Sequence, residues 1–417
     1  MTDTLLICGI GSGMDRSLAR VKEMGVRVLV VTDRITERVR RSADIYLEAD
    51  PDDFTGVLSV IRAERPGRIS GVMTLGYDNP PVVARLAAEL GCPGVPVEVA
   101  DLCTLKDRRI AALDRAGLPV PRFAVATTAD AALAALDRVG LPAVVKPSDR
   151  TGSLGVAKLD APGTAREPVE RALALSPTGR VVVEEYLTGT EHTVAGFAVD
   201  GRLRVTGFAD REYGEKERFF PHFFEGGDTL PSVLDEAQRA EVVRTVQRGV
   251  DALGLTTAVV NTDILRTPDG RVYLLEITCR LTGARIATEI MPLATGVDPL
   301  PNAVRLALGR PLAQEELRPT RDRAVVQRYL PADGGTVEWV GDLAELARTP
   351  GVHDVFWGLD LAPGTVLPPY RGGDEVLAGA ITSGPDTAAA EALATRVLSR
   401  LPLRLSDRRP AAPAPVP

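Results

Sequence analysis

The sequence predicts a mixed α/β and α+β protein made of three packed units. Strand-like apolar runs alternate with helical patterns near the N-terminus, which is typical of parallel βαβ units. An α+β stretch punctuated by Gly and Pro follows, and short strand patterns dominate the last part of the chain. Because 417 residues exceed one ordinary core, we expect several domains. We assign a parallel βαβ domain to 1–105, an α+β core to 106–322 with a mobile lid at about 120–188, and a small β-rich α+β domain to 323–405.

Composition excludes several classes of protein. A hydrophobic content of 45% and a charged content of 25% describe a soluble globular chain. The net charge of −7 and the lack of basic runs give no case for a nucleic-acid or membrane-surface partner. No apolar run reaches the roughly 18 residues needed to span a membrane, and no signal peptide is evident. The scattered cysteines and histidines lack metal-ligand spacing, so we expect a cytoplasmic protein without a zinc site.

Elements of the N-terminal domain follow from short apolar runs and the turns between them. The expected strands are Thr4–Cys8, Val26–Val31, Ile45–Leu47 and Ile69–Thr74, and the expected helices are Asp15–Met24, Asp53–Ala63 and Pro81–Leu90. Gly9-Ile-Gly11-Ser-Gly13 resembles a dinucleotide fingerprint but lacks the full G-x-G-x-x-G pattern. A tight turn lining a substrate site is therefore favoured over NAD binding.

The later elements are predicted in the same way. Lys106 opens a helix, and the lid elements lie between about 120 and 188. Antiparallel strands at 191–199 and 202–211 lead to an aromatic, irregular segment at 212–231, then to a helix at 234–253 and a hairpin at 257–277. Long irregular segments in compact domains are usually functional or disordered, and the aromatic content argues against disorder here. Residues 406–417 are rich in Pro and Ala, and we expect a disordered tail.

A lysine followed by a glycine-rich turn is the first chemical signal. Ala143-Val-Val-Lys146 runs into Ser148-Asp-Arg-Thr-Gly152-Ser153-Leu-Gly155, which places an ammonium beside backbone N–H groups able to approach an anion. Of the 49 basic residues only five are lysines. A retained lysine suggests a position that needs a compact ammonium, so Lys146 and Lys106 are candidates for phosphate binding. A surface hairpin remains the ordinary alternative.

A pair of carboxylates on one hairpin is the second signal. Asp263 and Glu276 flank the turn Pro268-Asp-Gly270, so the two strands bring them side by side. Carboxylates at the end of apolar strands are costly unless a cation neutralises them, and Mg²⁺ suits such a pair together with phosphate oxygens. Two exposed hairpin acids are the alternative. Arg280 and Arg285 follow closely and are suited to clamp a carboxylate or an acyl phosphate.

The third signal is an acidic strand end, Glu184-Glu185-Tyr186-Leu187, followed by Gly189 and Glu191. Backbone groups near Glu185 and Leu187 are suited to the edge of adenine, and Glu191 to ribose hydroxyls. By itself this is a generic strand end.

In this order the motifs resemble the ATP-grasp superfamily over nearly the whole chain. Phe219–Pro231, Leu281-Thr-Gly283 and Ala294–Asp298 are most similar to carboxylate–amine ligases related to L-amino acid ligases, and the C-terminal unit resembles that of biotin-carboxylase-like members. The resemblance implies ATP and Mg²⁺ as cofactors, small-molecule carboxylate and amine substrates, and a homodimer. It also implies amide formation through an acyl phosphate, with release of ADP and phosphate.

The resemblance also implies roles for individual residues. Those assigned to ATP are Lys106, Lys146, Ser148, Gly152, Ser153, Gly155, Glu184, Glu185, Leu187 and Glu191. Those assigned to Mg²⁺ are Asp263 and Glu276, and the catalytic pair is Lys146 and Arg280. Those assigned to substrate are Lys216, Phe220, His222, Arg280, Thr282, Gly283 and Arg285, although a packed, hydrogen-bonded His222 is an equal alternative.

One position departs from the family pattern and keeps two other functions open. The family reads Glu-x-Asn after the metal strand, whereas this chain reads Glu276-Ile-Thr278. A hydroxyl is a poorer ligand for a hard cation, so a second Mg²⁺ is in doubt unless Asn261 or water compensates. The rivals are carboxylation or phosphoryl transfer to another acceptor, and a nucleotide-binding sensor without turnover.

Overall fold

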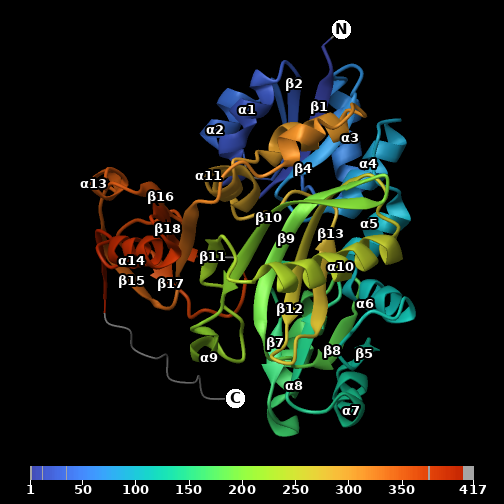
Figure 1. The fold of residues 1–417 in the computed structure, drawn as a ribbon, viewed down its shortest axis with the longest axis vertical. Helices are drawn as coiled ribbons and strands as arrows, with labels where there is room; N and C mark the ends of the chain where they lie inside the picture. Colours follow the sequence, from blue (N-terminus) through green and yellow to red (C-terminus); the bar gives the residue numbers. More distant parts are fainter. Residues whose placement is uncertain (1, 12, 34, 374–375, 407–417) are drawn as a thin grey trace.

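The computed structural model describes residues 2–11, 13–33, 35–373 and 376–406 (Figure 1). The predicted disordered tail, 406–417, lies outside the described residues apart from Ser406.

A parallel four-stranded sheet forms the N-terminal part, at the top of Figure 1. Its strand order is β3-β2-β1-β4, with β1 (Thr4–Ile10), β2 (Arg27–Thr32), β3 (Ile45–Glu48) and β4 (Gly71–Leu75). The helical elements around it are η1 (Met14–Ser17), α1 (Leu18–Glu23), α2 (Glu37–Ser42), α3 (Phe54–Glu64), α4 (Pro80–Glu89) and α5 (Val97–Thr104). The single helix expected at Asp15–Met24 is split into η1 and α1. Helix α2 was not predicted, and the side chain of Thr36 caps it by accepting from the Val39 amide at 3.2 Å.

The lid is a compact α+β unit at the bottom of Figure 1. Helix α6 (Lys106–Arg115) precedes a sheet of order β5-β8-β6-β7, made of β5 (Phe123–Ala126), β6 (Ala143–Pro147), β7 (Ala157–Leu159) and β8 (Val181–Glu185). Helices α7 (Ala129–Val139) and α8 (Arg166–Leu175), with η2 (Pro162–Thr164), complete it. The lid has its own apolar core, in which Ala132, Val145 and Val183 are fully buried, so it packs as one unit.

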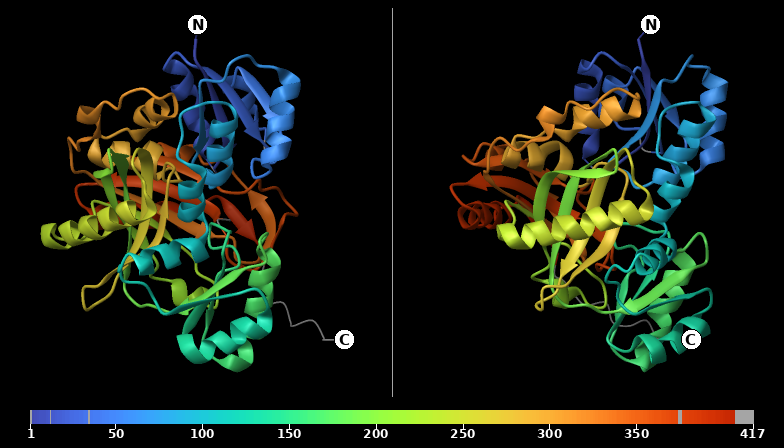
Figure 2. Two further views of the ribbon diagram at one scale, coloured as in Figure 1. Left: turned by 90° about the vertical axis from the view of Figure 1, so that its right-hand side faces the viewer. Right: turned by 45° about the vertical axis from the view of Figure 1, so that its right-hand side comes forward.

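An eight-stranded sheet of order β13-β12-β9-β10-β11-β14-β18-β16 occupies the centre. Its strands are β9 (Thr190–Val199), β10 (Arg202–Glu212), β11 (Gly227–Leu230), β12 (Ala258–Arg266), β13 (Val272–Thr278), β14 (Ala324–Pro331), β16 (Val352–Trp357) and β18 (Val376–Gly384). The long helix α10 (Glu236–Leu253) lies across one face, as Figure 2 shows. Val194 and Ala198 share a core with α10, whereas Ala195 packs with η3 (Ile286–Ile290) and α11 (Met291–Thr295) on the other face. This alternation follows from the two-residue period of a strand.

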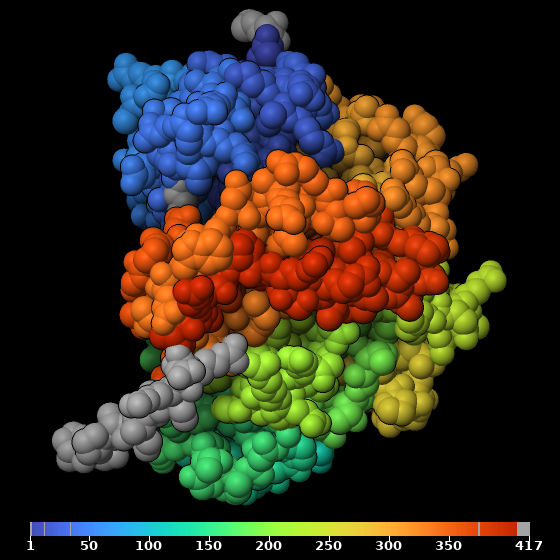
Figure 3. All heavy atoms as spheres, turned by 90° about the vertical axis from the view of Figure 1, so that its left-hand side faces the viewer, coloured from blue at the N-terminus to red at the C-terminus, as the bar shows by residue number. Residues whose placement is uncertain are grey.

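The C-terminal part shares the central sheet. Strands β14, β18 and β16 extend that sheet through the antiparallel pairing of β11 with β14. Strands β15 (Gly335–Val340), β17 (Val366–Leu367) and β19 (Leu403–Leu405) form a separate three-stranded sheet. The remaining helical elements are α9 (Lys216–Phe219), α12 (Pro299–Ala307), η4 (Gln314–Leu317), α13 (Ala344–Ala347) and α14 (Thr387–Leu398). In Figure 3 this part lies as a belt between the N-terminal sheet and the lid.

The predicted fold class is confirmed: a parallel α/β sheet, an α+β core with a lid, and a β-rich C-terminal part are all present. Because the central sheet crosses the predicted boundary at 322/323, the division into separate domains stays a prediction. Among the described residues, none of the helices combines the length and the apolar character needed to cross a bilayer.

Candidate active site

Lys146 lies near the end of β6 in the lid, and its ammonium contacts the carboxylate of Glu184 on the neighbouring strand β8. The two side chains are only 14% and 11% exposed, so the pair is largely shielded from water. An ammonium held by one carboxylate keeps donors for a further anion, because –NH₃⁺ has three N–H groups. The predicted phosphate lysine and the predicted adenine residue are therefore direct partners.

Lys106 begins α6 and joins that helix to the glycine-rich turn. Its amide donates to the Ser148 carbonyl at 2.8 Å, and its ammonium donates to the Arg150 carbonyl. Burial lowers the pKa of Lys106 to about 8, although the nearby charge of Glu276 opposes that effect. Burial disfavours the charged form of a lysine, and a polyphosphate would restore it. Ser148 donates its hydroxyl to Asp107, so its side chain is held against α6.

The turn from Ser148 to Gly155 has the backbone that a glycine-rich flap requires. Gly152, Ser153 and Gly155 have φ values of 59°, 57° and 76°. A Cβ on Gly155 would lie 2.9 Å from Pro147 Cγ, so both conformation and space demand glycine there. The flap also approaches the C-terminal part, where a Cβ on Gly372 would lie 2.9 Å from the Ser153 carbonyl oxygen.

The residues predicted to hold adenine and ribose, Glu185, Leu187 and Glu191, differ in their contacts with the protein. The Glu185 amide donates to the Arg122 carbonyl at 2.8 Å, and its carboxylate pairs with the Arg122 guanidinium at 3.1 Å. That hydrogen bond lowers the pKa of Glu185. Leu187, half-buried, follows the end of β8. Burial raises the pKa of Glu191 on β9. The charge of Arg211 lowers that pKa and the charge of Asp263 raises it. The adenine and ribose roles stay predictions.

The carboxylate pair forms as the hairpin pattern predicts. Asp263 on β12 lies directly opposite Glu276 on β13, with a register shift immediately after Asp263. Burial and the nearby Asp78 raise the pKa of Glu276, which shows that a second anion is costly there. A cation between the two carboxylates would remove that cost.

Arg211, on β10, was missed by the sequence analysis and stands next to this pair. Its guanidinium contacts Asp263 and also Glu225, and Thr193 donates its hydroxyl to the other Asp263 oxygen at 2.7 Å. Within the described ranges, no group of three or more His, Cys, Asp or Glu side chains is arranged to hold a metal. The donor set of two carboxylates still fits Mg²⁺, which takes one or two carboxylates together with phosphate oxygens and water.

Thr278 lies two residues beyond Glu276 on β13, opposite Asn261. Its hydroxyl oxygen is buried and has no hydrogen-bond partner in the part of the chain that the structure describes. The side-chain carbonyl of Asn261, the suggested substitute ligand, accepts from the Thr282 hydroxyl at 2.7 Å. Asn261 therefore holds the 282–285 loop, and the number of Mg²⁺ ions stays open.

Arg280 pairs with Asp78, which follows β4 at the carboxyl edge of the parallel sheet. The guanidinium and the carboxylate are 2.9 Å apart and each is 11% exposed. Burial alone would raise the pKa of Asp78, but the charge and hydrogen bond of Arg280 hold it below its ordinary value. Position at the end of a parallel strand is the signal that could have identified Asp78 from the sequence.

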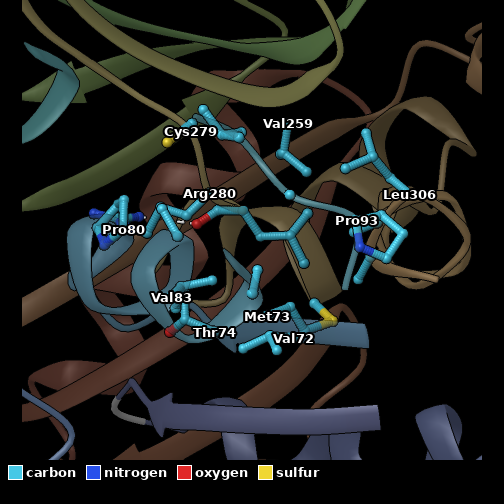
Figure 4. A pocket seen from close by; sticks show the side chains of 17 residues that line it. Val72, Met73, Thr74, Pro80, Val83, Pro93, Val259, Cys279, Arg280 and Leu306 are labelled. Atoms are coloured by element: carbon cyan, nitrogen blue, oxygen red, sulfur yellow. Dashed lines mark hydrogen bonds between the residues drawn. The ribbon is translucent and has the colours of Figure 1, made fainter. Parts of the chain in front are cut away.

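An apolar cavity lies behind Arg280, between β4, α4 and α12 (Figure 4). Its interior offers about 70 Å³ to water-sized molecules. Its walls include Val72, Met73, Val83, Val259 and Leu306, and Arg280 donates to the Leu281 carbonyl there at 2.9 Å. Neither Asp263 nor Glu276 lines this cavity, so it is separate from the metal pair.

The aromatic segment meets the lid at Tyr186. The ammonium of Lys216 lies 5.9 Å from the Tyr186 ring centroid, and the Phe220 ring packs edge-on to Tyr186 with the centroids 6.3 Å apart. Lys158 lies over both rings, at 5.0 Å from Tyr186 and 4.5 Å from Phe220. His222 is half-buried, and burial lowers its pKa. Its Nδ1 has no hydrogen-bond partner among the described residues, whereas a hydrogen bond with the Val156 backbone favours the charged imidazole. The substrate role and the packed, hydrogen-bonded alternative therefore both stay predictions.

The loop after β13 ties three parts of the chain together. Arg285 has a φ of 65°, contacts Asp354 on β16, and stacks on Phe356 with its guanidinium carbon 3.7 Å from the ring centroid. Gly283 lies close to the Gly76 carbonyl, where a Cβ would be 3.3 Å from the oxygen. Arg285, predicted to contact substrate, is thus engaged by protein groups in this structure.

Two family descriptions match the chain. Residues 112–280 match the family described as D-ala D-ala ligase C-terminus, and residues 328–406 match L-amino acid ligase C-terminal domain 2. The first match contains the lid, the hinge and the carboxylate pair.

Individual proteins agree with these matches. The chain is 30% identical over 345 residues to a Sinorhizobium fredii protein described as uncharacterized protein y4rH, covering 81% of this chain and 69% of that one. It is 31% identical over 170 residues to D-alanine–D-alanine ligase of Gloeobacter violaceus, covering 37% of this chain and 51% of that enzyme.

Solved structures show the same fold. L-amino acid ligase from Bacillus licheniformis superposes with a TM-score of 0.81 at 22% identity, covering 97% of this chain and 99% of that one. The biotin carboxylase domain of Hydrogenobacter thermophilus 2-oxoglutarate carboxylase was solved with MgADP, ADP and bicarbonate. It superposes with a TM-score of 0.72 at 18% identity, covering 98% of this chain and 92% of that one. At these identities the likeness concerns the fold alone.

Proposed function

Because this chain belongs to the ATP-grasp carboxylate–amine ligases, we propose that it uses ATP to join the carboxylate of an amino acid to an amine. The carboxylate is activated as an acyl phosphate, the amine displaces the phosphate, and the products are an amide, ADP and phosphate. The substrates are small molecules.

The observation that carries this proposal is the meeting of two lysines and two carboxylates from distant parts of the chain. Asp263 and Glu276 lie opposite each other. Lys106 is near enough to Glu276 and Lys146 for both charges to act on its pKa, the first raising it and the second lowering it. This arrangement offers ammonium groups for phosphate oxygens and carboxylates for a hard cation. Catalysis of phosphoryl transfer rests mainly on such positioning and charge stabilisation.

Each residue then has a role in the proposed reaction. Lys146 and Lys106 hold the polyphosphate, and the flap from Ser148 to Gly155 covers it and excludes water. Asp263 and Glu276 would hold Mg²⁺, which offsets charge on the phosphate oxygens. Arg280, oriented by Asp78, stabilises negative charge on the acyl phosphate and on the tetrahedral adduct.

Loss of ADP formation in Lys146→Ala is the test of this function. We expect ADP release, measured with a coupled assay across a panel of amino acids, to fall by at least about 100-fold, since one charge contact to the transferring group is lost. Lys22→Ala is the matched control, because Lys22 pairs with Asp44 and is 44% exposed. Circular dichroism checks that both variants keep the fold. Undiminished turnover in Lys146→Ala would reject the assignment of this lysine.

The same assay separates the rivals. ATP turnover that requires bicarbonate and no amine would favour carboxylation. Tight ATP binding with no ADP release from any donor would favour a nucleotide sensor, the alternative that the unpartnered Thr278 hydroxyl supports. The predicted homodimer and the cytoplasmic location stay predictions, and light scattering of the purified chain tests the first.

A further inference from the structure

Asp228 is a buried carboxylate to which the proposed reaction gives no task. It lies on β11 with 0% of its surface exposed. Neither of its carboxylate oxygens has a hydrogen-bond partner in the described part of the chain. Burial raises the pKa of Asp228 to about 6. Buried polar groups are almost always hydrogen-bonded, and an unpaired buried carboxylate destabilises the fold. We therefore expect a bound ligand to supply the missing hydrogen-bond donors.

A second free acceptor lies beside it. Gln327 on β14 is the cross-strand partner of Asp228, and it is 1% exposed. Its amide nitrogen donates to the Tyr329 hydroxyl, whereas its amide oxygen has no partner among the described residues. Directly opposed residues project from the same face with their Cβ atoms about 5 Å apart. Three buried acceptor oxygens therefore gather at one place on the sheet.

Two arginines near Asp228 leave these oxygens unpaired. Arg211 is the other cross-strand neighbour of Asp228, but its guanidinium contacts Asp263 and Glu225. Arg328 donates to the backbone carbonyl of Asp228 at 3.1 Å, and its guanidinium pairs with Glu391. In the sheet order, the strand that carries Arg211 lies between Asp228 and Asp263. On the other side, the Tyr329 hydroxyl donates to the Ala284 carbonyl at 3.4 Å, in the loop that contains Thr282 and Gly283. The acceptors lie between the metal pair and this loop.

We propose that Asp228 and Gln327 form a subsite for the ammonium group of the amino acid whose carboxylate is activated. This inference rests on the proposed function and adds to it the residues that recognise the protonated amino group of the acyl donor. Asp228 supplies the charge, and the Gln327 oxygen supplies the third acceptor.

An ammonium group fits this place better than other cations. It has three N–H donors for three acceptor oxygens, and its single charge matches one carboxylate. The Arg211 guanidinium beside this place repels a divalent ion about twice as strongly as a singly charged ammonium.

The group bound there belongs to the acyl donor and not to the attacking amine. A nucleophilic amine must be neutral, whereas an amine held by a carboxylate stays protonated. This difference in protonation makes the subsite one for recognition of the acyl donor.

Ligand-induced stabilisation of the full chain tests the subsite without turnover. L-alanine, β-alanine and L-leucine are compared with propionate and 4-methylpentanoate, which lack the amino group. We expect at least one amino acid to raise the wild-type Tm by a few degrees, and its des-amino analogue to have no effect. In Asp228→Asn the shift is lost, while the ligand-free Tm equals or exceeds that of wild type, because an unpaired buried charge is gone. Asp360→Asn, the same change at an exposed position, keeps the wild-type response.

Turnover is measured with hydroxylamine as the amine. Hydroxylamine converts acyl phosphates into hydroxamates, and the hydroxamate formed is quantified. For the amino acid that binds, kcat/KM of Asp228→Asn falls by roughly 30-fold or more, whereas the KM for ATP is unchanged. Gln327→Leu gives a smaller loss of the same kind. If Asp228 had only a structural role, the ligand-free Asp228→Asn variant would have a lower Tm than the ligand-free wild type.

The outcomes separate the subsite from the ligase function. Equal hydroxamate formation from amino acids and des-amino acids in wild type overturns the subsite and leaves the ligase function standing. Amino-acid-specific stabilisation that Asp228→Asn abolishes, without ADP or hydroxamate from any donor, supports the subsite and rejects the function. Wild-type protein that neither binds nor uses any of the three amino acids in preference to its analogue also overturns the subsite.

Discussion

Buried charges are concentrated where the lysines and carboxylates meet. Lys106, Arg211 and Arg280 are cations placed against Glu276, Asp263 and Asp78, and the pKa shifts of Lys106 and Glu276 follow from this burial. Such charges cost stability unless they are paired, and they persist where a ligand supplies the missing partner. At the scale of residues, this clustering of opposed charges is the arrangement that the proposed ATP and Mg²⁺ site requires.

The pKa of Lys106 predicts how ATP affinity depends on pH. With its pKa at about 8 in the free protein, Lys106 loses its proton as the pH rises through that value. A polyphosphate favours the charged form, so ATP must restore the proton at higher pH. We therefore expect the Kd for ATP to increase between about pH 8 and 9.5, by up to tenfold per pH unit. In Lys106→Arg the guanidinium stays charged, and the Kd, measured by calorimetry, should be flat over this range. A wild-type profile as flat as that of the arginine variant contradicts the role of Lys106.

At the scale of elements, the lid is a rigid sheet with one strained turn. Its sheet has its own buried core, while the turn between β6 and β7 contains positive φ values at Gly152, Ser153 and Gly155. Segment 370–373 of the C-terminal part contacts two neighbours: Tyr370 donates to the Phe223 carbonyl of the aromatic segment at 2.8 Å, and Arg171 of the lid donates to the Arg371 carbonyl at 3.1 Å. The C-terminal part is thereby in contact with both the aromatic segment and the lid.

Gly155→Ala is expected to weaken the flap. Its φ of 76° and the short distance from a new Cβ to Pro147 make alanine costly, by about 1–3 kcal/mol. We expect a lower Tm and a higher KM for ATP, measured by calorimetry and by ADP release. Gly163→Ala in the same lid is the control, because a Cβ there meets nothing within 4 Å. Equal effects of the two substitutions would contradict the steric argument.

At the scale of the whole molecule, one carboxylate joins three parts of the chain. Asp354 on β16 pairs with Arg16 of η1 at 2.7 Å and with Arg285 of the loop after β13. Arg285 is 7% exposed and Arg16 is 38% exposed, so the two pairs differ in their shielding from water. The N-terminal part, the 282–285 loop and the C-terminal part are thus fixed relative to one another through charges.

Asp354→Asn should therefore loosen the assembly of the three parts. Removing one partner of a buried pair costs on the order of 3 kcal/mol, because Arg285 is left uncompensated. We expect a lower Tm and faster cleavage by protease near the 282–285 loop. Arg16→Ala breaks the more exposed pair and should cost less than about 1 kcal/mol. A smaller loss in Asp354→Asn than in Arg16→Ala would contradict the shared role of Asp354.

Local patterns were enough to predict much of the site. The hairpin turn at Pro268-Asp-Gly270 determines that Asp263 and Glu276 face each other, and the structure has them in register. Apolar runs ending in Lys146 and in Glu184 likewise predict the strands that bring these two side chains into contact. In each case the relevant information lies within one hairpin or at the end of one strand.

The amino-acid sequence by itself determined the fold class, the order of the motifs, the α+β unit of the lid and the juxtaposition of the two carboxylates, because turn chemistry and apolar periodicity are local properties. Only the tertiary structure decided that β11 pairs with β14 and so brings Asp228 beside Gln327, about a hundred positions apart in the chain. It also decided that Asp78 orients Arg280 and that Arg211 links Asp263 to Glu225. These contacts depend on which strands become neighbours, and that is set by burial over the whole molecule rather than by any segment alone.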